Sequence, residues 1–460
     1  MEDRDTLTVF ALGGLGGGNA FGAGVLTALT DLEIYPDVIT CTSGMIAWTA
    51  LYLAGEDLPA ELRKGEAMQS LAGVPEIMKP AVMGSAMLKM SKNTLQANMK
   101  NWMKPISSFD DFADAAMPVR VLDPFVTPDQ LEMYAAAMRE SEVGVIFNAY
   151  EPTSGTEILF ANDAAHKRVP LKNMEGRRIE EITPQGVESA LWLSQYGYTR
   201  QDGSPQMAID GAYRRQFIIQ EVMHATRLFV ARPEHRKYLG RMPRNQLEQK
   251  VFETYMWFSA AYRSEMQMIR MANQWTRDGR LKGRQITDIV EIENEIPMTY
   301  DSYFTETSES MERARASTKA RFDDAWLDPK LILRKIDFMS DMSTRFLQKL
   351  ANYLAPVIPV RGEAVVSKGE PGDAMYIVTE GEVTVEAAEA ITLSSGDFFG
   401  EMALIDDSPR NATVRAGDMC KLFRLSRRDF NHLSEIEPEF AKRVHDVFEA
   451  RKKVNAKKIA

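Results

Sequence analysis

Cysteine and histidine are scarce in this chain of 460 residues, which contains two cysteines and five histidines. Cys41 and Cys420 lie far apart in sequence and form no disulfide framework, and so few cysteines are typical of a reducing compartment. The Cys and His positions show none of the spacings that zinc sites use. The sequence therefore predicts neither a disulfide-stabilised fold nor a metal site.

Positive charge is also in deficit, because 55 Lys and Arg stand against 65 Asp and Glu, for a net charge of -10. An acidic surface is repelled by phosphate backbones, so we expect no nucleic-acid partner. The acidic start at residues 1–5 is unlike a secretory signal. Two uncharged runs, 6–30 and 38–55, are long enough for a bilayer span, but glycines in the first and turn-forming residues in the second favour buried elements. We expect a cytoplasmic protein that visits the inner face of the membrane transiently.

The chain divides into three regions. Residues 1–215 alternate short apolar strands, such as 7–12 and 37–40, with helical stretches, which predicts a parallel sheet with flanking helices. Residues 216–330 have apolar side chains at helical spacing and are expected to form a helical extension of the first region. Residues 331–460 begin with a helix and then become rich in strands. The expected fold class is an α/β domain followed by an all-β, jelly-roll-like domain with flanking helices.

The strand-rich C-terminal region contains short apolar runs separated by glycines, as a β-roll requires. Within it, Gly400-Glu401-Met402-Ala403 is followed, at a Gly-to-Arg span of eleven positions, by Arg410-Asn411-Ala412. A glycine lets the backbone approach a sugar phosphate, and an arginine can grip phosphate oxygens with its fork of donors. This pattern resembles the phosphate-binding cassette of cyclic nucleotide-binding domains.

The resemblance implies a role for each residue of the cassette. Arg410 would hold the cyclic phosphate and Glu401 would accept from the ribose 2′-hydroxyl. Asn411 can both donate and accept, so cAMP and cGMP both stay open as the regulatory ligand. A roll that has lost its ligand is the alternative. The residues expected to bind the nucleotide are Gly400, Glu401, Met402, Ala403, Arg410, Asn411 and Ala412.

The glycine-rich run that follows the first strand introduces a second motif. Residues 12–26 read LGGLGGGNAFGAGVL, residues 40–47 read TCTSGMIA, and much later Asp210 begins the sequence DGA. Together these resemble the oxyanion loop, the nucleophile elbow and the aspartate signature of patatin-like phospholipases. The resemblance implies that Ser43 is the nucleophile and Asp210 its base, with no catalytic cofactor. The expected oxyanion donors are Gly14, Gly16, Gly17 and Gly18.

This sequence departs from the patatin-like pattern at two places. Cys41 and Met45 replace the outer glycines of the elbow, and Gly18-Asn19 stands where the family has a cation followed by glycine. A degenerate domain without activity is therefore one alternative. A Ser–Asp–His triad that uses His224 or His235 is another. A dinucleotide-binding loop is disfavoured, because it would need a third glycine where Asn19 stands. Cys41 is not the expected nucleophile, because it precedes the turn, where a small packed side chain is expected.

Residues 77–109 carry lysines and methionines but no acidic residue, which is consistent with a lid that contacts an anionic lipid surface or with an ordinary core helix. The hypothesis that joins these motifs is a phospholipase A-like lipid acyl hydrolase that a cyclic nucleotide regulates. Because no helix-turn-helix follows the roll, we expect it to act on residues 1–330, through helices over 336–354 and 427–453. The competing hypothesis is an inactive sensor whose first domain binds lipid or a protein partner. A homo-oligomer stays open.

Overall fold

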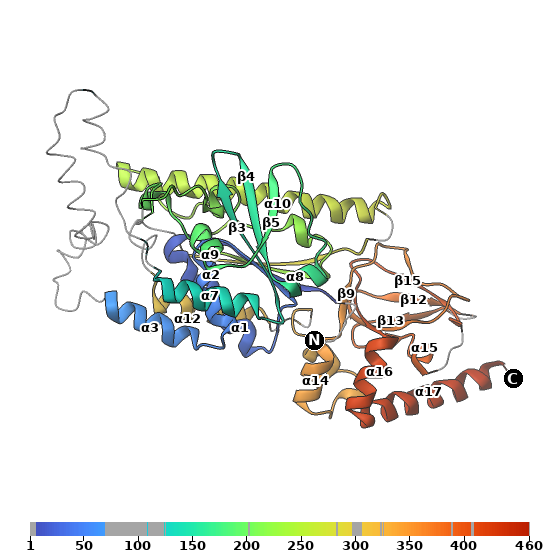
Figure 1. Cartoon of the computed structure of the whole chain (residues 1–460). Coiled ribbons are helices and arrows are strands. Elements are labelled where there is room, and N and C mark those ends of the chain that lie inside the picture. The colour runs from blue at the N-terminus through green and yellow to red at the C-terminus, as the bar shows by residue number, and fades with distance from the viewer. Residues whose placement is uncertain are drawn as a thin grey trace.

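The computed structural model contains an α/β domain and a β-roll that lie side by side (Figure 1). It describes residues 6–69, 108, 124, 126–200, 203–281, 284–296, 306–322, 324, 326–387, 390–405 and 409–459. In this part of the chain, no helix has both the length and the hydropathy to cross a bilayer. The predicted lid at 77–109 lies outside the described residues, apart from Ser108.

The α/β domain is built on one mostly parallel sheet, in the order β5-β4-β3-β2-β1-β7-β8, with β6 paired to β3. The strand β1 runs parallel to its neighbours β2 and β7, and its residues from Val9 to Leu12 are buried, as a central strand covered on both faces requires. The pairs β3–β4 and β3–β6 are antiparallel. The strands are β1 (Thr8–Leu12), β2 (Val38–Cys41), β3 (Gly144–Glu151), β4 (Thr156–Ala161), β5 (Arg177–Glu181), β6 (Ile209–Asp210), β7 (Arg227–Arg232) and β8 (Asp288–Glu293).

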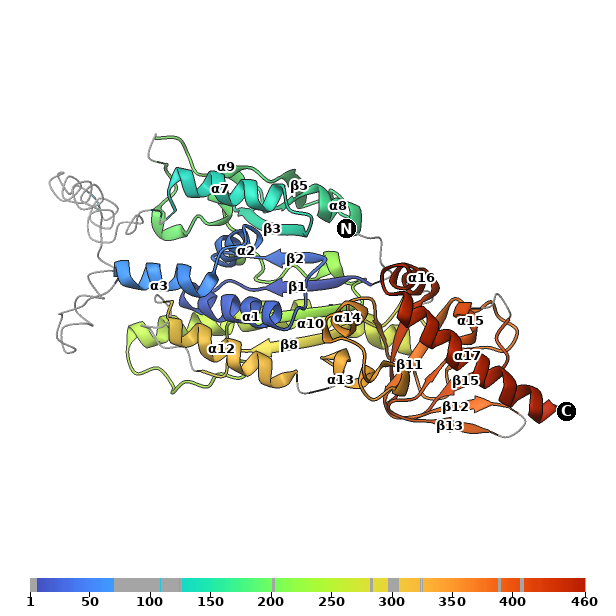
Figure 2. The same ribbon diagram turned by 90° about the horizontal axis from the view of Figure 1, so that it is seen from below.

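Helices cover both faces of this sheet (Figure 2). One core joins a sheet face to α1, α2, α3, α7, α9 and α12, and the core of the other face includes α8 and α10. This three-layer arrangement confirms the predicted α/β architecture. The helices are α1 (Asn19–Asp31), α2 (Met45–Leu53), α3 (Leu58–Gln69), α7 (Pro128–Arg139), α8 (Asp163–Arg168), α9 (Pro184–Ala190), α10 (Gln246–Arg277) and α12 (Ser308–Arg321).

The region 216–330 differs from its prediction as a helical extension. It does contain α10 and α12, but it also supplies β7 and β8, and β7 lies directly beside β1. These strands escaped prediction because each has six residues and carries charged side chains. The charge of Arg227 is neutralised by a residue that is distant in sequence but close in space, since its Nε lies 2.7 Å from Asp288 Oδ2. The region is therefore part of the sheet.

The roll consists of two four-stranded sheets, β10-β15-β12-β13 and β14-β11-β16-β9, as the strand-rich sequence predicted. The helical stretch predicted over 427–453 is two helices, because Pro438 has no backbone N–H and disfavours helical geometry at Glu437. The strands are β9 (Ala355–Val357), β10 (Ala364–Val366), β11 (Ala374–Glu380), β12 (Val383–Glu386), β13 (Ile391–Leu393), β14 (Phe398–Phe399), β15 (Thr413–Ala416) and β16 (Lys421–Ser426). The helices are α13 (Pro329–Leu333), α14 (Thr344–Ala351), α15 (Met402–Ile405), α16 (Arg427–Ile436) and α17 (Pro438–Ile459).

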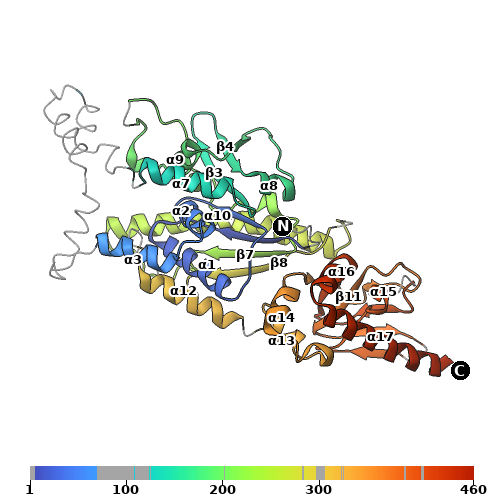
Figure 3. The same cartoon turned by 60° about the horizontal axis from the view of Figure 1, so that its bottom comes forward.

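The roll packs against the amino-terminal ends of the parallel strands (Figure 3). Trp326 lies at this contact, with its ring stacked on Phe423 of β16 at a centroid distance of 5.0 Å. Its indole Nε1 donates to Asp288 Oδ1 at 3.0 Å, and Arg227 donates to its carbonyl oxygen at 2.8 Å. Because Arg227 and Asp288 are the first residues of β7 and β8, the roll and the carboxyl ends of these strands are at opposite ends of the sheet.

Candidate functional site

Ser43 occupies a sharp turn between β2 and α2, at the carboxyl end of the strand. Its φ of +52° is in the left-handed region, which non-glycine residues adopt rarely and mostly where the surrounding structure holds them. Thr42 supplies part of that support, because its hydroxyl donates to the carbonyl oxygen of Gln216 at 2.7 Å and accepts from the N–H of Gly14 at 3.2 Å. Ser43 thus has the backbone geometry of the predicted nucleophile elbow.

Asp210 faces Ser43 from the end of β6. The Ser43 hydroxyl donates to Asp210 Oδ2 at 2.5 Å, and the other carboxylate oxygen accepts from the N–H of Ala212 at 2.8 Å. Asp210 is only 2% exposed, and this burial raises the pKa of its carboxyl group from 3.8 to about 6. A carboxylate with a pKa near neutrality is suited to accept a proton from the serine.

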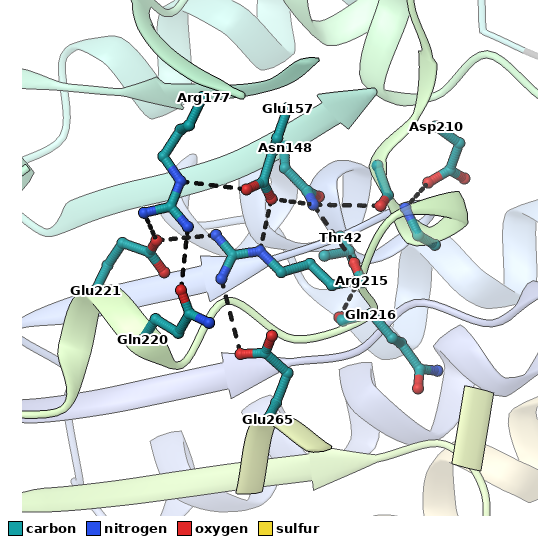
Figure 4. A network of polar contacts seen from close by, with 12 residues as sticks. Thr42, Asn148, Glu157, Arg177, Asp210, Arg215, Gln216, Gln220, Glu221 and Glu265 are labelled. Carbon is teal, nitrogen blue, oxygen red and sulfur yellow. Dashed lines mark hydrogen bonds and ion pairs between the residues drawn. The ribbon is translucent and has the colours of Figure 1, made fainter. Parts of the chain in front are cut away.

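A buried polar network holds the loop that carries Asp210 (Figure 4). Asn148 Nδ2 donates to the carbonyl oxygens of Gly211 and Arg215, at 3.3 and 3.4 Å. A Cβ on Gly211 would lie 2.1 Å from Asn148 Oδ1, so glycine is needed for this approach. Glu157 ties the two parts together, because it accepts from Asn148 at 3.2 Å and from Arg215 Nε at 2.6 Å. The network fixes the position of Asp210 relative to the sheet.

The charges of this network balance one another in the protein interior. Burial acts to raise the pKa of Glu157, but the guanidinium groups of Arg215 and Arg177 outweigh it and hold that pKa below its usual value. Arg215 also contacts Glu221 at 2.9 Å, and Arg177 reaches Glu221 at 2.6 Å. Such paired charges are tolerated in a core only with good geometry. No sequence motif predicted this cluster, because its members are spread along the chain from β3 to the segment after β6.

The glycine loop begins where β1 ends and leads into a short 3₁₀ turn, Gly16–Gly18, before α1. Gly14 donates its N–H to Thr42, and Gly18 donates its N–H to Leu15 O at 2.8 Å. In this structure the N–H groups of these two predicted oxyanion donors are therefore already bonded within the protein. Gly16 and Gly17 open the 3₁₀ turn, and the first N–H groups of a helix have no acceptor within it. The geometry favours Gly16 and Gly17.

Both departures from the patatin-like pattern are accommodated by neighbouring residues. Met45 is fully buried, and a Cβ on Gly22 of α1 would lie 2.5 Å from its sulfur, so the bulk of Met45 fills space that Gly22 leaves. Asn19 Oδ1 accepts from the N–H of Leu15 at 3.0 Å, and its amide nitrogen approaches Gly44 closely. The elbow and the glycine loop therefore pack together without the family residues.

Glu306 lies beside this junction. Its carboxylate accepts from Trp48 Nε1 at 3.1 Å and also bonds the side chain of Asn19, while burial raises its pKa. Because Asn19 holds the N–H of Leu15, Glu306 contributes to the shape of the glycine loop. No sequence motif pointed to this residue, which stands just before α12.

The rival catalytic residues have other surroundings. Cys41 is buried, and burial raises its pKa to about 12, so its thiol stays protonated. His224 precedes β7, at the amino-terminal end, with its Nε2 3.1 Å from the carbonyl oxygen of Arg168. His235 lies 3.5 Å from Glu293. Asp210 contacts Ser43 directly, which is the geometry expected of the predicted Ser–Asp dyad.

The second site lies in the roll, around Gly400 at the end of β14. Gly400 has a φ of +83°, and a Cβ there would lie 2.6 Å from Arg410 Nη1. The Arg410 side chain is only 5% exposed, yet its contacts are long: 3.3 Å to Gly400 O and 3.4 Å to Asp373 Oδ1. Asp373 itself is 68% exposed. A buried guanidinium with such weak partners is suited to bind an anion.

Glu401 is buried beside Arg410 and has a partner that the sequence did not reveal. Arg451 Nη1 of α17 lies 2.8 Å from Glu401 Oε1, and the same guanidinium lies 4.2 Å from the ring centre of Phe398. The other predicted residues flank the pair: Met402 and Ala403 begin α15, Ala412 precedes β15, and the exposed Asn411 contacts the sulfur of Met402 at 3.6 Å.

Comparison with known proteins decides the nature of the roll. Residues 360–437 match the family model of the cyclic nucleotide-binding domain. The C-terminal part of this chain is a cyclic nucleotide-binding domain. The match includes every residue predicted for the nucleotide, from Gly400 to Ala412. The prediction of this domain is thereby confirmed.

Several similar proteins match about a quarter of this chain. A cAMP-dependent protein kinase regulatory subunit from Yarrowia lipolytica is 37% identical over 23% of this chain and 32% of its own length. A cyclic nucleotide-gated potassium channel from Rhizobium etli is 36% identical over 25% of this chain and 32% of its own. A solved cyclic nucleotide-binding domain from Methylobacillus flagellatus is 24% identical over 29% of this chain and 82% of its own, with a TM-score of 0.26. The chain spans about a third of the length of these curated relatives.

Proposed function

We propose that this protein is a serine acyl hydrolase that acts on lipid esters and is regulated by a cyclic nucleotide. The observation that carries the proposal is the Ser43 hydroxyl, which donates to Asp210 at 2.5 Å from a left-handed turn at the end of β2. The resemblance of the glycine loop, the elbow and the DGA sequence to patatin-like phospholipases adds support and indicates phospholipids as the substrate class.

The proposed reaction needs only side chains and backbone groups of this chain. Asp210 takes the hydroxyl proton of Ser43 while the serine oxygen attacks the ester carbonyl carbon. The N–H groups of Gly16 and Gly17 stabilise the negative charge that develops on the carbonyl oxygen. As the tetrahedral intermediate collapses, Asp210 returns the proton to the departing alcohol, leaving Ser43 acylated. Water, deprotonated by Asp210, then cleaves the acyl-serine bond to release a fatty acid.

The nucleotide would bind with its phosphate on Arg410 and its ribose on Glu401. A phosphate replaces the weak contact to the exposed Asp373 with a charge-assisted pair, which supports binding. Glu401 must exchange Arg451 for the ribose hydroxyl, so binding would alter the contact between α17 and the roll. The relative from Yarrowia lipolytica is named as the regulatory subunit of a cAMP-dependent protein kinase, which makes cAMP the first ligand to test.

The position of the roll changes the expected route of regulation. The predicted helices over 336–354 and 427–453 pack with the roll at the amino-terminal ends of the strands, whereas Ser43 follows the carboxyl end of β2. The helices of the roll therefore do not lie over Ser43 in this structure. Trp326 contacts β7, β8 and β16, and we propose that nucleotide binding in the roll affects the sheet of the α/β domain through this residue.

The enzymatic proposal is tested with purified chain, mixed phospholipids and a soluble p-nitrophenyl ester, each with and without cAMP or cGMP. We expect fatty acid release by the wild type and none above background by Ser43→Ala. Ser154→Ala, in the exposed turn between β3 and β4, serves as the matched control and should behave as wild type. Release by Ser43→Ala equal to that of the wild type, or none by either, would leave the competing hypothesis of a non-catalytic sensor.

The nucleotide site is tested by calorimetry on Arg410→Ala. Losing a charge-assisted contact costs on the order of 2 kcal/mol, or about 30-fold in affinity. Arg415→Ala removes an equal charge from β15 of the same roll, where the exposed side chain pairs with Glu386 at 2.7 Å, and should leave the affinity unchanged. Equal affinities for the two variants would contradict the assigned phosphate contact.

A further inference from the structure

The segment between β7 and α10 concentrates cations in an otherwise acidic protein. Residues 235–245 read HRKYLGRMPRN and contain four Lys or Arg and no acidic residue. Arg241 pairs with Glu248 and Arg236 approaches Glu293. Lys237 and Arg244 are exposed, and among the described residues neither side-chain cation lies within 4.0 Å of a carboxylate, while Glu248 accepts from the backbone N–H of Arg244 at 2.8 Å. Their positive charges are therefore available to an external anion.

Apolar side chains are also exposed on this segment and on α10, against which the segment packs. Met242 is 67% exposed and Leu239 is 42% exposed, while Trp257 of α10 is 51% exposed and its neighbour Met256 is 45% exposed. Tyr238 fastens the segment to the helix, because its ring packs on Phe252 and Tyr255 at centroid distances of 4.8 and 5.1 Å. Exposed tryptophan and methionine near exposed cations favour a partner surface that is both apolar and anionic.

This surface adjoins the catalytic dyad. Trp257 faces Tyr213 at 5.9 Å, and the next residue, Phe258, packs with Leu15 of the glycine loop and with Ala212. Ala212 in turn donates its N–H to Asp210. The surface also follows the carboxyl end of β7, so it lies at the same end of the sheet as Ser43. A partner bound here would therefore meet the active site.

We propose that Lys237, Leu239, Met242, Arg244, Met256 and Trp257 form a docking surface for an anionic lipid bilayer. The inference deepens the proposed function, on which it rests, by naming the physical form in which the substrate is met. Charge complementarity carries it, because a cationic patch on a chain of net charge -10 orients the molecule toward an anionic surface. Methionine and tryptophan can enter the headgroup region, while the cations stay at the phosphates.

The test is co-sedimentation of the full chain with vesicles of phosphatidylcholine alone or mixed with phosphatidylglycerol, with and without cAMP. We expect binding to the anionic vesicles only, weakened by salt. Each cation near such a surface contributes roughly fivefold in affinity, so Lys237→Glu with Arg244→Glu should bind at least about 25-fold more weakly. Lys335→Glu with Arg345→Glu, which changes the same charge on exposed residues of the C-terminal part, should bind as wild type.

Two further readouts keep the proposal falsifiable. Lipid should shift the tryptophan emission of the wild type to the blue, and Trp257→Phe should lose that shift. Hydrolysis of a soluble ester should be unchanged in the Lys237/Arg244 variant. Equal binding to neutral vesicles, wild-type binding by that variant, or capture of an acidic protein without any vesicle binding would overturn the docking surface. Charge-dependent vesicle binding without Ser43-dependent hydrolysis would uphold it and refute the enzyme instead.

Discussion

Replacing Asp210 with asparagine should stabilise the fold at neutral pH while it abolishes hydrolysis. Burial raises the pKa of Asp210 from 3.8 to about 6, which means that the folded chain disfavours the charged form. Asparagine has the same shape and no charge. Its amide can also keep the contacts with the Ser43 hydroxyl and the N–H of Ala212. The variant therefore removes the buried charge and little else.

The sign and size of this effect follow from proton linkage. The folded chain binds the Asp210 proton more tightly than the unfolded chain, so this contribution to stability is complete below pH 3.8 and is lost as the pH rises through about 6. At 1.36 kcal/mol per pKa unit, the loss amounts to about 3 kcal/mol. Asparagine cannot lose that proton. Between pH 3.8 and about pH 6, the free energy of unfolding of the wild type should thus decrease relative to that of the variant.

Urea unfolding of both proteins between about pH 4 and pH 8 measures the difference directly, and other titrating groups cancel in it. We expect the advantage of Asp210→Asn to grow up to about pH 6 and then stay constant. Ester hydrolysis by the wild type should rise over the same range, because the base must be ionised. A stability difference independent of pH, or a variant less stable than wild type at neutral pH, would refute the assigned pKa and the role built on it.

Two other predictions concern packing. Gly24→Ala would place a Cβ 2.3 Å from the carbonyl oxygen of Met311, so α1 and α12 must separate, which should lower the free energy of unfolding by about 1–3 kcal/mol. In Gly65→Ala of α3 the new Cβ would have no atom within 4 Å, so the free energy of unfolding should rise by up to about 1 kcal/mol. Urea unfolding separates the two, and equal effects would contradict the α1–α12 contact. Trp326→Ala should keep nucleotide affinity in calorimetry but lose the effect of the nucleotide on ester hydrolysis, and an unchanged effect would exclude this residue as the route.

Local motifs explain why the two sites could be found in the sequence. The turn at Ser43 and the Gly400-to-Arg410 cassette each occupy a short stretch, where glycine spacing and the order of strand and helix already fix the backbone. The main strand, β1, was predictable for a similar reason, since a short apolar run between glycine and charged residues indicates a buried strand. Contacts within such stretches depend little on the rest of the fold.

Partners distant in sequence could not be found in this way. Arg227 begins β7 and is neutralised by Asp288, 61 residues later, so a charged residue that argues against a buried strand is in fact satisfied there. Likewise, Arg451 meets Glu401 only because α17 returns across the roll. The sequence shows the chemistry of each residue but not which residues become its neighbours in the fold. The environments of Arg227 and Glu401 both depend on such a neighbour.

The separation of the two sites limits how one can influence the other. Trp326 touches the first residues of β7 and β8, while Ser43 follows the carboxyl end of β2, so a signal must traverse the length of the sheet. A packed helix suits that purpose, because close-packed elements move as rigid bodies rather than deform continuously. The helix α12 packs closely on α1, ends near Trp326, and is preceded by Glu306, which bonds Asn19 of the glycine loop. Regulation of Ser43 by this route would therefore act on the proposed oxyanion donors.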